Sequence, residues 1–134
     1  MDFDSKQKVL IAIYMEYQKD IPDMEQVAAQ SVGLDQQIFF IALDKLENEG
    51  LIRGVSYSRR GSEIFMAFTK NIMMTTHGLY YVETKLNIQP EKTGLEKMKE
   101  ISQSVAAWGW NEAKDFAAKV LSEIIQSQAG VKRS

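Results

Sequence analysis

The stretch of the chain that ends at Gly50 constrains the fold more than any other part. Apolar spacing predicts a helix over 36–49, which begins after Asp35 as its N-cap. Its inner face is formed by Phe39, Ala42, Leu43 and Leu46. Gly50 follows directly, and because it lacks a Cβ the chain can reverse there. Leu51 and Ile52 come next, so the helix must feed straight into an apolar strand.

The segments on either side complete an order of elements. Apolar spacing predicts helices over 5–19 and 24–31, each preceded by an aspartate N-cap, with Gly33 as the turn before the third helix. Alternation over 51–57 and 63–68, around a polar tip, predicts a β-hairpin with Ile64, Met66 and Phe68 on one face. A fourth helix is expected over 75–86. This order predicts a mainly α fold with a small hairpin, a winged helix-turn-helix domain over 1–88.

Residues 89–134 predict a helical extension with two apolar stripes. The stripes are Leu95, Met98, Ile101, Val105 and Trp108, and Phe116, Ala117, Val120, Leu121, Ile124 and Ile125. A core made of residues 1–88 can cover only part of this surface, so we expect residues 93–128 to join two copies as a homodimer. The candidate interface residues are Trp108, Phe116, Val120 and Ile124. The alternative is that these helices fold back on their own winged domain.

Composition argues against several classes of function. The chain has no cysteine and one histidine, which disfavours disulfides, thiolate metal sites and histidine-based catalysis. No acid–base pair, nucleophile set or phosphate-binding loop stands out, so neither an enzyme nor a cofactor is expected. The sequence contains no run of about 18 apolar residues, so no membrane span is expected. A cytoplasmic protein is the resulting expectation.

The charge balance counts against nucleic-acid binding by the whole surface. The chain carries a net charge of −2, whereas nucleic-acid binders usually have a basic surplus. Residues 1–88 hold 9 basic and 12 acidic side chains, and residues 89–134 hold 7 and 6. Any affinity for DNA must therefore come from a local group of basic residues.

Such a group is predicted on the third helix and the hairpin. If that helix enters the major groove, its outward positions include Gln37 and Asn48, which can pair with adenine, and Lys45, which can reach phosphate or guanine. Arginines in the hairpin suit phosphate or minor-groove contact. The candidate DNA-binding residues are Gln36, Gln37, Lys45, Asn48, Arg53, Arg59 and Arg60.

The same helix also allows a different partner. Phe40 and Ile41 are expected on its outward face, and Asp44 and Glu47 would repel phosphate. An apolar outward surface fits a protein partner better than a phosphate backbone. Both interpretations, a DNA-binding face and a protein-interaction face, stay open from the sequence.

Two segments resemble one family. The stretch from Leu43 to Tyr57, with its Glu-Gly-Leu-Ile-Arg-Gly-Val-Ser-Tyr run, is similar to the YjcQ family of small winged-helix proteins. The stretch from Met74 to Tyr81 resembles that family's Thr-x-x-Gly-aliphatic-x-Tyr segment, and the resemblance covers residues 7–88. Members occur in Gram-positive bacteria and their phages, so it implies a transcriptional regulator of phage or prophage type. The alternative is a protein-interaction module with the same fold.

Overall fold

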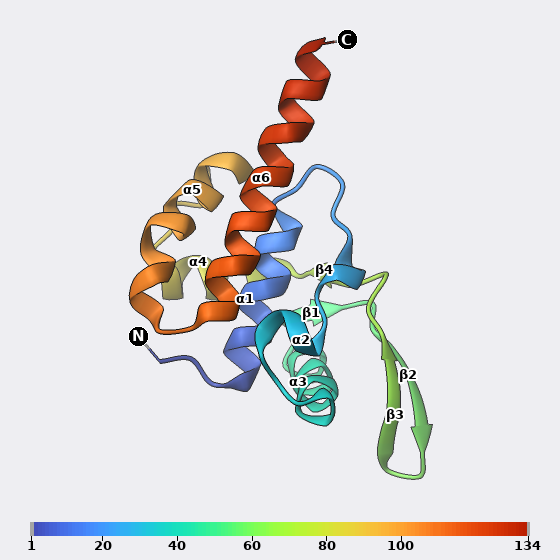
Figure 1. The fold of residues 1–134 in the computed structure, drawn as a ribbon. Helices are drawn as coiled ribbons and strands as arrows, with labels where there is room; N and C mark the ends of the chain where they lie inside the picture. Colours follow the sequence, from blue (N-terminus) through green and yellow to red (C-terminus); the bar gives the residue numbers. More distant parts are fainter. Residues whose placement is uncertain (1, 134) are drawn as a thin grey trace.

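The computed structural model describes residues 2–133, with side chains described over 2–128 (Figure 1). Its elements are α1 (Ser5–Tyr17), the 3₁₀ helix η1 (Met24–Gln26), α2 (Ala29–Val32), α3 (Gln36–Asn48), β1 (Ile52–Arg53), β2 (Ser56–Arg60), β3 (Glu63–Phe68), β4 (Met73–Met74), α4 (Thr76–Leu86), α5 (Gly94–Ser104), the 3₁₀ helix η2 (Val105–Trp108) and α6 (Asn111–Arg133). The predicted mainly α fold with a small hairpin is confirmed.

Local sequence signals place most helix ends. Asp4 accepts a hydrogen bond from the Gln7 N–H at 2.9 Å, and the Gln7 side chain accepts the Asp4 N–H at 3.0 Å, which makes the expected capping box of α1. Asp35 caps α3 through the N–H groups of Gln37 and Ile38. Gly33 and Gly50 adopt φ angles of 73° and 77° at the two turns that flank α3.

The prediction of one continuous second helix over 24–31 is wrong. The chain forms η1 and α2 instead, separated by Val27 and Ala28 in extended conformations. The Ser31 hydroxyl explains the break, because it accepts the Ala28 N–H at 3.2 Å and donates to the Gln26 carbonyl at 2.7 Å. A serine side chain that binds nearby backbone in this way competes with continuous helix.

The predicted face of β3 is also wrong. Ile64 is buried, but Met66 and Phe68 are exposed, and Ala67 takes the second buried position. The pairing of β2 with β3 shifts between Ser58 and Arg59, so Phe65 is an extra residue without an opposite partner. Such a β-bulge interrupts strict alternation, which moves every later side chain to the other face.

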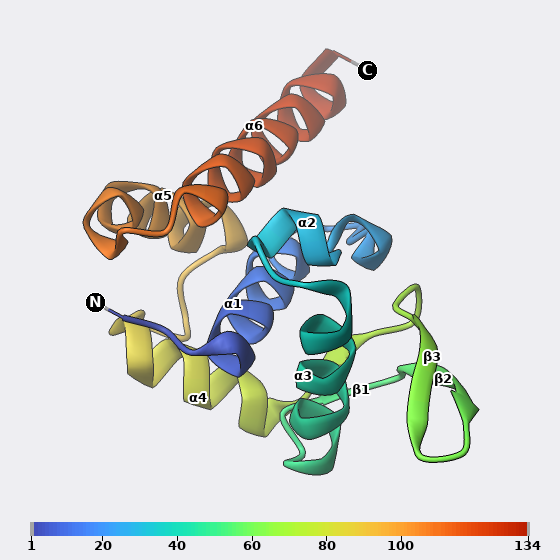
Figure 2. The same cartoon turned by 60° about the horizontal axis from the view of Figure 1, so that its bottom comes forward.

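Helix α1 lies in the middle of the molecule (Figures 1 and 2). In Figure 2 α3 and α4 lie on one side of it, and α5 and α6 on the other. Every residue from Val9 to Glu16 is buried, and α1 contacts α2, α3, α4 and α6. The core is therefore built around this one helix.

The residues predicted to form a dimer interface are buried within the chain. Trp108, Phe116, Val120 and Ile124 are all less than 9% exposed. Trp108 packs edge-on against Phe3, and α6 contacts α1, α2 and α5. The proposed role of these four residues between copies is thus wrong, and the fold-back alternative is what the structure shows. The reason is that α1 is apolar on a second face, which the C-terminal helices cover.

A buried polar cluster ties the two parts of the chain together. Glu83 of α4 accepts a hydrogen bond from the Tyr14 hydroxyl at 2.9 Å and pairs with Lys97 of α5 at 2.7 Å. All three side chains are almost completely enclosed. Burial and then the hydrogen bond to Glu83 raise the pKa of Tyr14 well above its usual value, so its hydroxyl stays a donor.

We expect Lys97→Met to lower the free energy of unfolding by about 3 kcal/mol, because it leaves the Glu83 carboxylate buried without its cation. Lys99→Met, on the same helix but exposed, should change it by less than about 0.5 kcal/mol. Urea unfolding followed by circular dichroism measures both. Equal effects of the two variants would contradict this role of Lys97.

Candidate nucleic-acid interface

The outward face of α3 carries the polar residues predicted for it. Gln36, Gln37, Lys45 and Asn48 are all exposed. Asp35 occupies the N-terminus of the helix with its carboxylate on two backbone N–H groups. The positive end of α3 is therefore already neutralised, and contacts to a ligand would come from side chains along the helix.

Phe40 does not belong to this outward face, contrary to the prediction. It is only 6% exposed and packs against Phe39 with the ring centroids 6.2 Å apart. Asp44 and Glu47, one and two turns further on, face the hairpin through Arg59 and the Val55 N–H. Helix α3 contacts α1 on one side and β3 on another. More of its circumference is therefore buried than the single core-facing stripe that helical spacing predicts.

The hairpin places its arginines in two different environments. Arg59 donates to Asp44 of α3 at 3.1 Å and lies over the Tyr57 ring at 4.8 Å. Arg60 lies over the Phe65 ring at 5.1 Å. Arg53 is exposed in β1, and no ion pair among residues 2–128 involves Arg53, Arg60 or Lys45. The free positive charge on this face is carried by these three residues.

Acidic groups reduce the positive charge of the same face. Glu47 accepts the Val55 N–H at 3.1 Å, and Glu49 pairs with Lys6 at 2.7 Å. Burial, followed by the charges of Glu47 and Asp44, raises the pKa of Tyr57 above its usual range. The candidate interface is thus a mixed surface on which three cations remain free.

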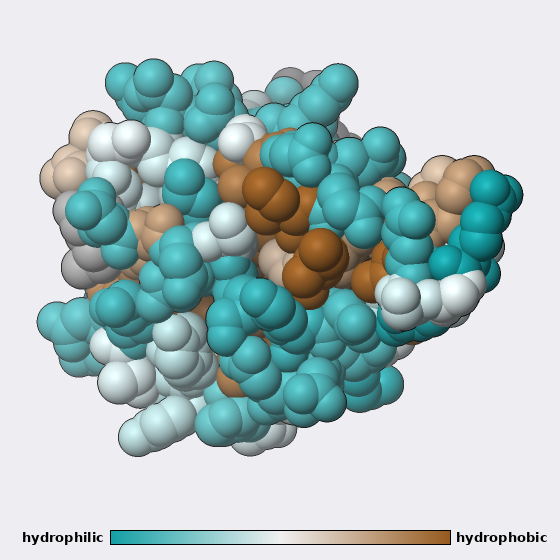
Figure 3. Space-filling view, turned by 90° about the horizontal axis from the view of Figure 1, so that it is seen from below, coloured by the Kyte–Doolittle hydropathy of each residue, from teal (hydrophilic) through white to brown (hydrophobic). Residues whose placement is uncertain are grey.

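Apolar side chains share this surface, and the sequence predicted only one of them, Ile41, to face outward. Figure 3, the view from below, shows a hydrophobic patch in the middle of this face, surrounded by hydrophilic groups. Ile38 and Ile41 of α3 are 46% and 40% exposed, and Phe65 and Phe68 of β3 are 60% and 56% exposed. Ile38 could have been found from its i, i+3 spacing to Ile41, whereas Phe65 and Phe68 depend on the bulge.

The two segments that carry the family resemblance meet at one backbone corner. The Thr75 hydroxyl donates to the Gly50 carbonyl at 2.6 Å and accepts the Gly78 N–H at 2.9 Å. The Thr75 N–H donates to the Leu51 carbonyl, and β1 pairs with β4 beside it. A Cβ on Gly78 would lie 2.0 Å from the Leu51 oxygen. These motif residues therefore fix the start of α4 against the end of α3.

The family of the chain follows from one comparison. The chain runs through α1, η1, α2, α3, the β2–β3 hairpin and α4, a mainly α fold with a small hairpin. The family model described as YjcQ protein matches residues 7–103, so the chain belongs to the YjcQ family. That match extends past position 88 and includes most of α5. No curated protein and no solved structure matches the chain significantly.

Two further kinds of feature are absent from the described residues. Over this part of the chain no helix is long and apolar enough to cross a membrane. The described side chains also include no cluster of three or more histidine, aspartate or glutamate residues that could hold a metal ion. His77 is exposed in the first turn of α4, where Thr75 is the N-cap.

We expect Gly78→Ala to lower the free energy of unfolding by about 2 kcal/mol or more, because the new methyl group meets the Leu51 carbonyl. Helix propensity alone would give the opposite sign, a stabilisation of up to about 1 kcal/mol. The exposed neighbour serves as the control, since His77→Ala should be nearly neutral. Thermal or urea unfolding decides the sign, and a more stable Gly78→Ala protein would refute the close approach.

Proposed function

We propose that this protein is a winged-helix DNA-binding protein that acts as a transcriptional regulator of phage or prophage type. The observation that carries the proposal is the shared side of α3 and the hairpin. Both project away from α5 and α6, side by side in the two views (Figures 1 and 2). A helix for the major groove and a wing for the neighbouring backbone need this arrangement.

In the proposed complex α3 enters the major groove. Gln37 and Asn48 read adenine edges, and Lys45 reaches phosphate or guanine. Arg60 contacts phosphate from the β2–β3 hairpin and Arg53 from the neighbouring strand β1, while Arg59 stays with Asp44. The four residues predicted for a dimer interface, Trp108, Phe116, Val120 and Ile124, are buried within the chain. The proposal therefore does not depend on a dimer through α5 and α6.

We expect the double variant Arg53→Ala, Arg60→Ala to weaken binding to all DNA sequences and to flatten its salt dependence. Each lost phosphate contact lowers the slope of log K against log salt by about 0.9, so the expected change is about 1.8. Fluorescence anisotropy on genomic fragments at several salt concentrations measures the slope.

The matched control removes two cations from the opposite part of the molecule. Lys99→Ala, Lys114→Ala takes away the same charge from α5 and α6 and should leave the slope unchanged. Asp44→Asn should strengthen binding, since it releases Arg59 and removes an anion from the face. Equal slopes for the two double variants would indicate general charge attraction and reject the proposed interface.

A protein-interaction module is the second candidate, and the exposed Ile38, Ile41 and Phe68 favour it. If a protein is the ligand, Ile41→Glu should abolish the complex, because a carboxylate cannot be desolvated in an apolar interface. Ile125→Glu, an equally exposed isoleucine on α6, is the control. Loss of DNA binding in Ile41→Glu, with no protein complex formed by the wild type, would favour DNA instead.

A further inference from the structure

A cavity lies on the part of the molecule away from α3 and the hairpin. Its volume is about 480 Å³, and it is enclosed by the end of α1, the loop into η1, the start of α5 and one face of α6. Polar groups from all of these elements line it, among them Lys19, Asp20, Asp23, Gln26, Thr93 and Glu123. Segments distant in sequence therefore build one polar site.

Beside this cavity lies the carboxylate of Glu16, of which only one oxygen has hydrogen-bond partners. Glu16 is completely buried, and its Oε2 atom accepts the Asp23 N–H and the Lys19 ammonium, each at 2.8 Å. Its Oε1 atom is buried and has no hydrogen-bond partner among the described residues. A buried charged oxygen without a donor is more costly than a neutral group left unpaired in the same place.

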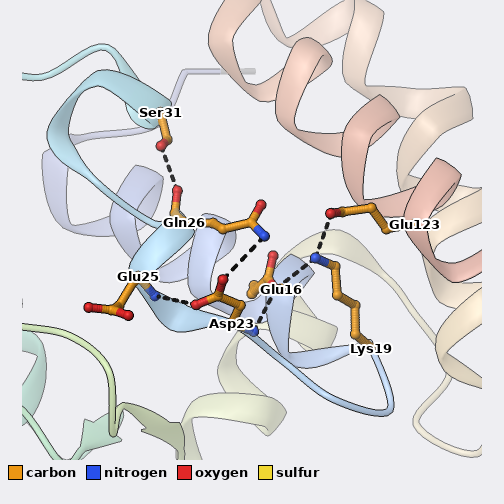
Figure 4. Close-up of polar contacts among 7 residues, drawn as sticks. All are labelled: Glu16, Lys19, Asp23, Glu25, Gln26, Ser31 and Glu123. Atoms are coloured by element: carbon orange, nitrogen blue, oxygen red, sulfur yellow. Dashed lines mark hydrogen bonds and ion pairs between the residues drawn. The ribbon is translucent and has the colours of Figure 1, made fainter. Parts of the chain in front are cut away.

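A second acceptor in the same place lacks a donor. The Gln26 Oε1 atom is also buried without a partner in the described part of the chain, while its amide nitrogen lies 3.5 Å from Asp23. Figure 4 shows the Glu16 carboxylate pointing toward the side chains of Gln26 and Lys19, with Glu123 across the gap on α6. The two unmatched oxygens thus belong to one cluster: Gln26 lines the cavity, and Glu16 is buried beside it against the lining residues Lys19 and Asp23.

The charges around the cluster are unbalanced toward the acidic side. Lys19 is the cation of the cavity wall, and it is shared between Glu16 and Glu123. Burial opposes its charged form, but the hydrogen bonds to Glu123 and Glu16 outweigh burial and raise the pKa of Lys19. Asp20 and Asp23 add two further carboxylates to the wall. The site has more acceptors and negative charge than its single ammonium can match.

We propose that this cavity binds a small organic cation that carries a primary ammonium or a guanidinium group. Such a group brings several N–H donors and a positive charge, which are the two properties that the Glu16 and Gln26 oxygens lack. Gln26 and Lys19 have long side chains and can move aside for it. An anionic ligand would meet the lining carboxylates of Asp20, Asp23 and Glu123, whose charge the ammonium of Lys19 does not balance. The proposal is independent of the DNA-binding function.

The test is titration of the full chain with 1,4-diaminobutane and with methylguanidinium at constant ionic strength. Backbone amide chemical shifts of Asp23 and Gly94 report on the cavity, and calorimetry gives the affinity. We expect saturable binding of one of the two cations and none of 1,4-butanediol, the neutral analogue of the diamine. Absence of saturable binding for both cations means that water satisfies the two oxygens and overturns the proposal.

Two variants test the assignment to this cavity. Glu123→Gln removes a half-buried charge from the cavity wall and should weaken binding about tenfold, the loss of one charge-assisted contact. Glu16→Gln removes the negative charge and replaces one carboxylate oxygen by an NH2 group. It should weaken binding at least as much. Asp115→Asn, an exposed acid of α6 outside the cavity, is the matched control. Equal affinities in all three variants would show nonspecific ion binding and overturn the proposal.

Discussion

The burial of α1 around its whole circumference is the constraint on which the rest of the structure depends. From Val9 to Glu16 every residue is enclosed, so no face of this part of the helix is left for solvent. An apolar helix of this kind has to be surrounded by other elements. The segments α3 and α4 cover one side of it, and α5 and α6 cover the other (Figure 2). The C-terminal helices are therefore part of the core and complete it.

Two polar groups of α1 decide how the surrounding helices are placed. Tyr14 needs a partner in the core, and Glu83 of α4, held by Lys97 of α5, provides it. Glu16, half a turn further along, takes the Asp23 N–H and Lys19, and Lys19 reaches Glu123 of α6. Because buried polar groups are expensive to leave unpaired, these contacts select one arrangement among the many that apolar packing would allow.

Local signals in the sequence were sufficient to predict most helices and turns. They were insufficient to predict which elements pack against one another. The caps at Asp4 and Asp35 and the turn at Gly50 follow from neighbouring residues, so their prediction is confirmed. The break after Gln26 and the bulge at Phe65 depend on single hydrogen-bonding choices that periodicity does not contain. The apolar stripes of α5 and α6 were visible, but not the surface they cover. That surface was implied by the continuous apolar run from Val9 to Met15 in α1.

The positions that fix the fold and the positions available to a ligand are different residues. Thr75 and Gly78 are occupied by contacts to the Gly50 and Leu51 backbone, so the segments that mark the family hold a corner of the chain together. Recognition has to come from outside that corner, from exposed residues such as Lys45 and Arg60. Membership in the YjcQ family thus specifies a scaffold, while the proposed DNA binding depends on the exposed cations of the α3 face. Because Asp44 holds Arg59, one ion pair takes a cation away from the proposed DNA-binding surface and leaves its exposed apolar side chains more prominent.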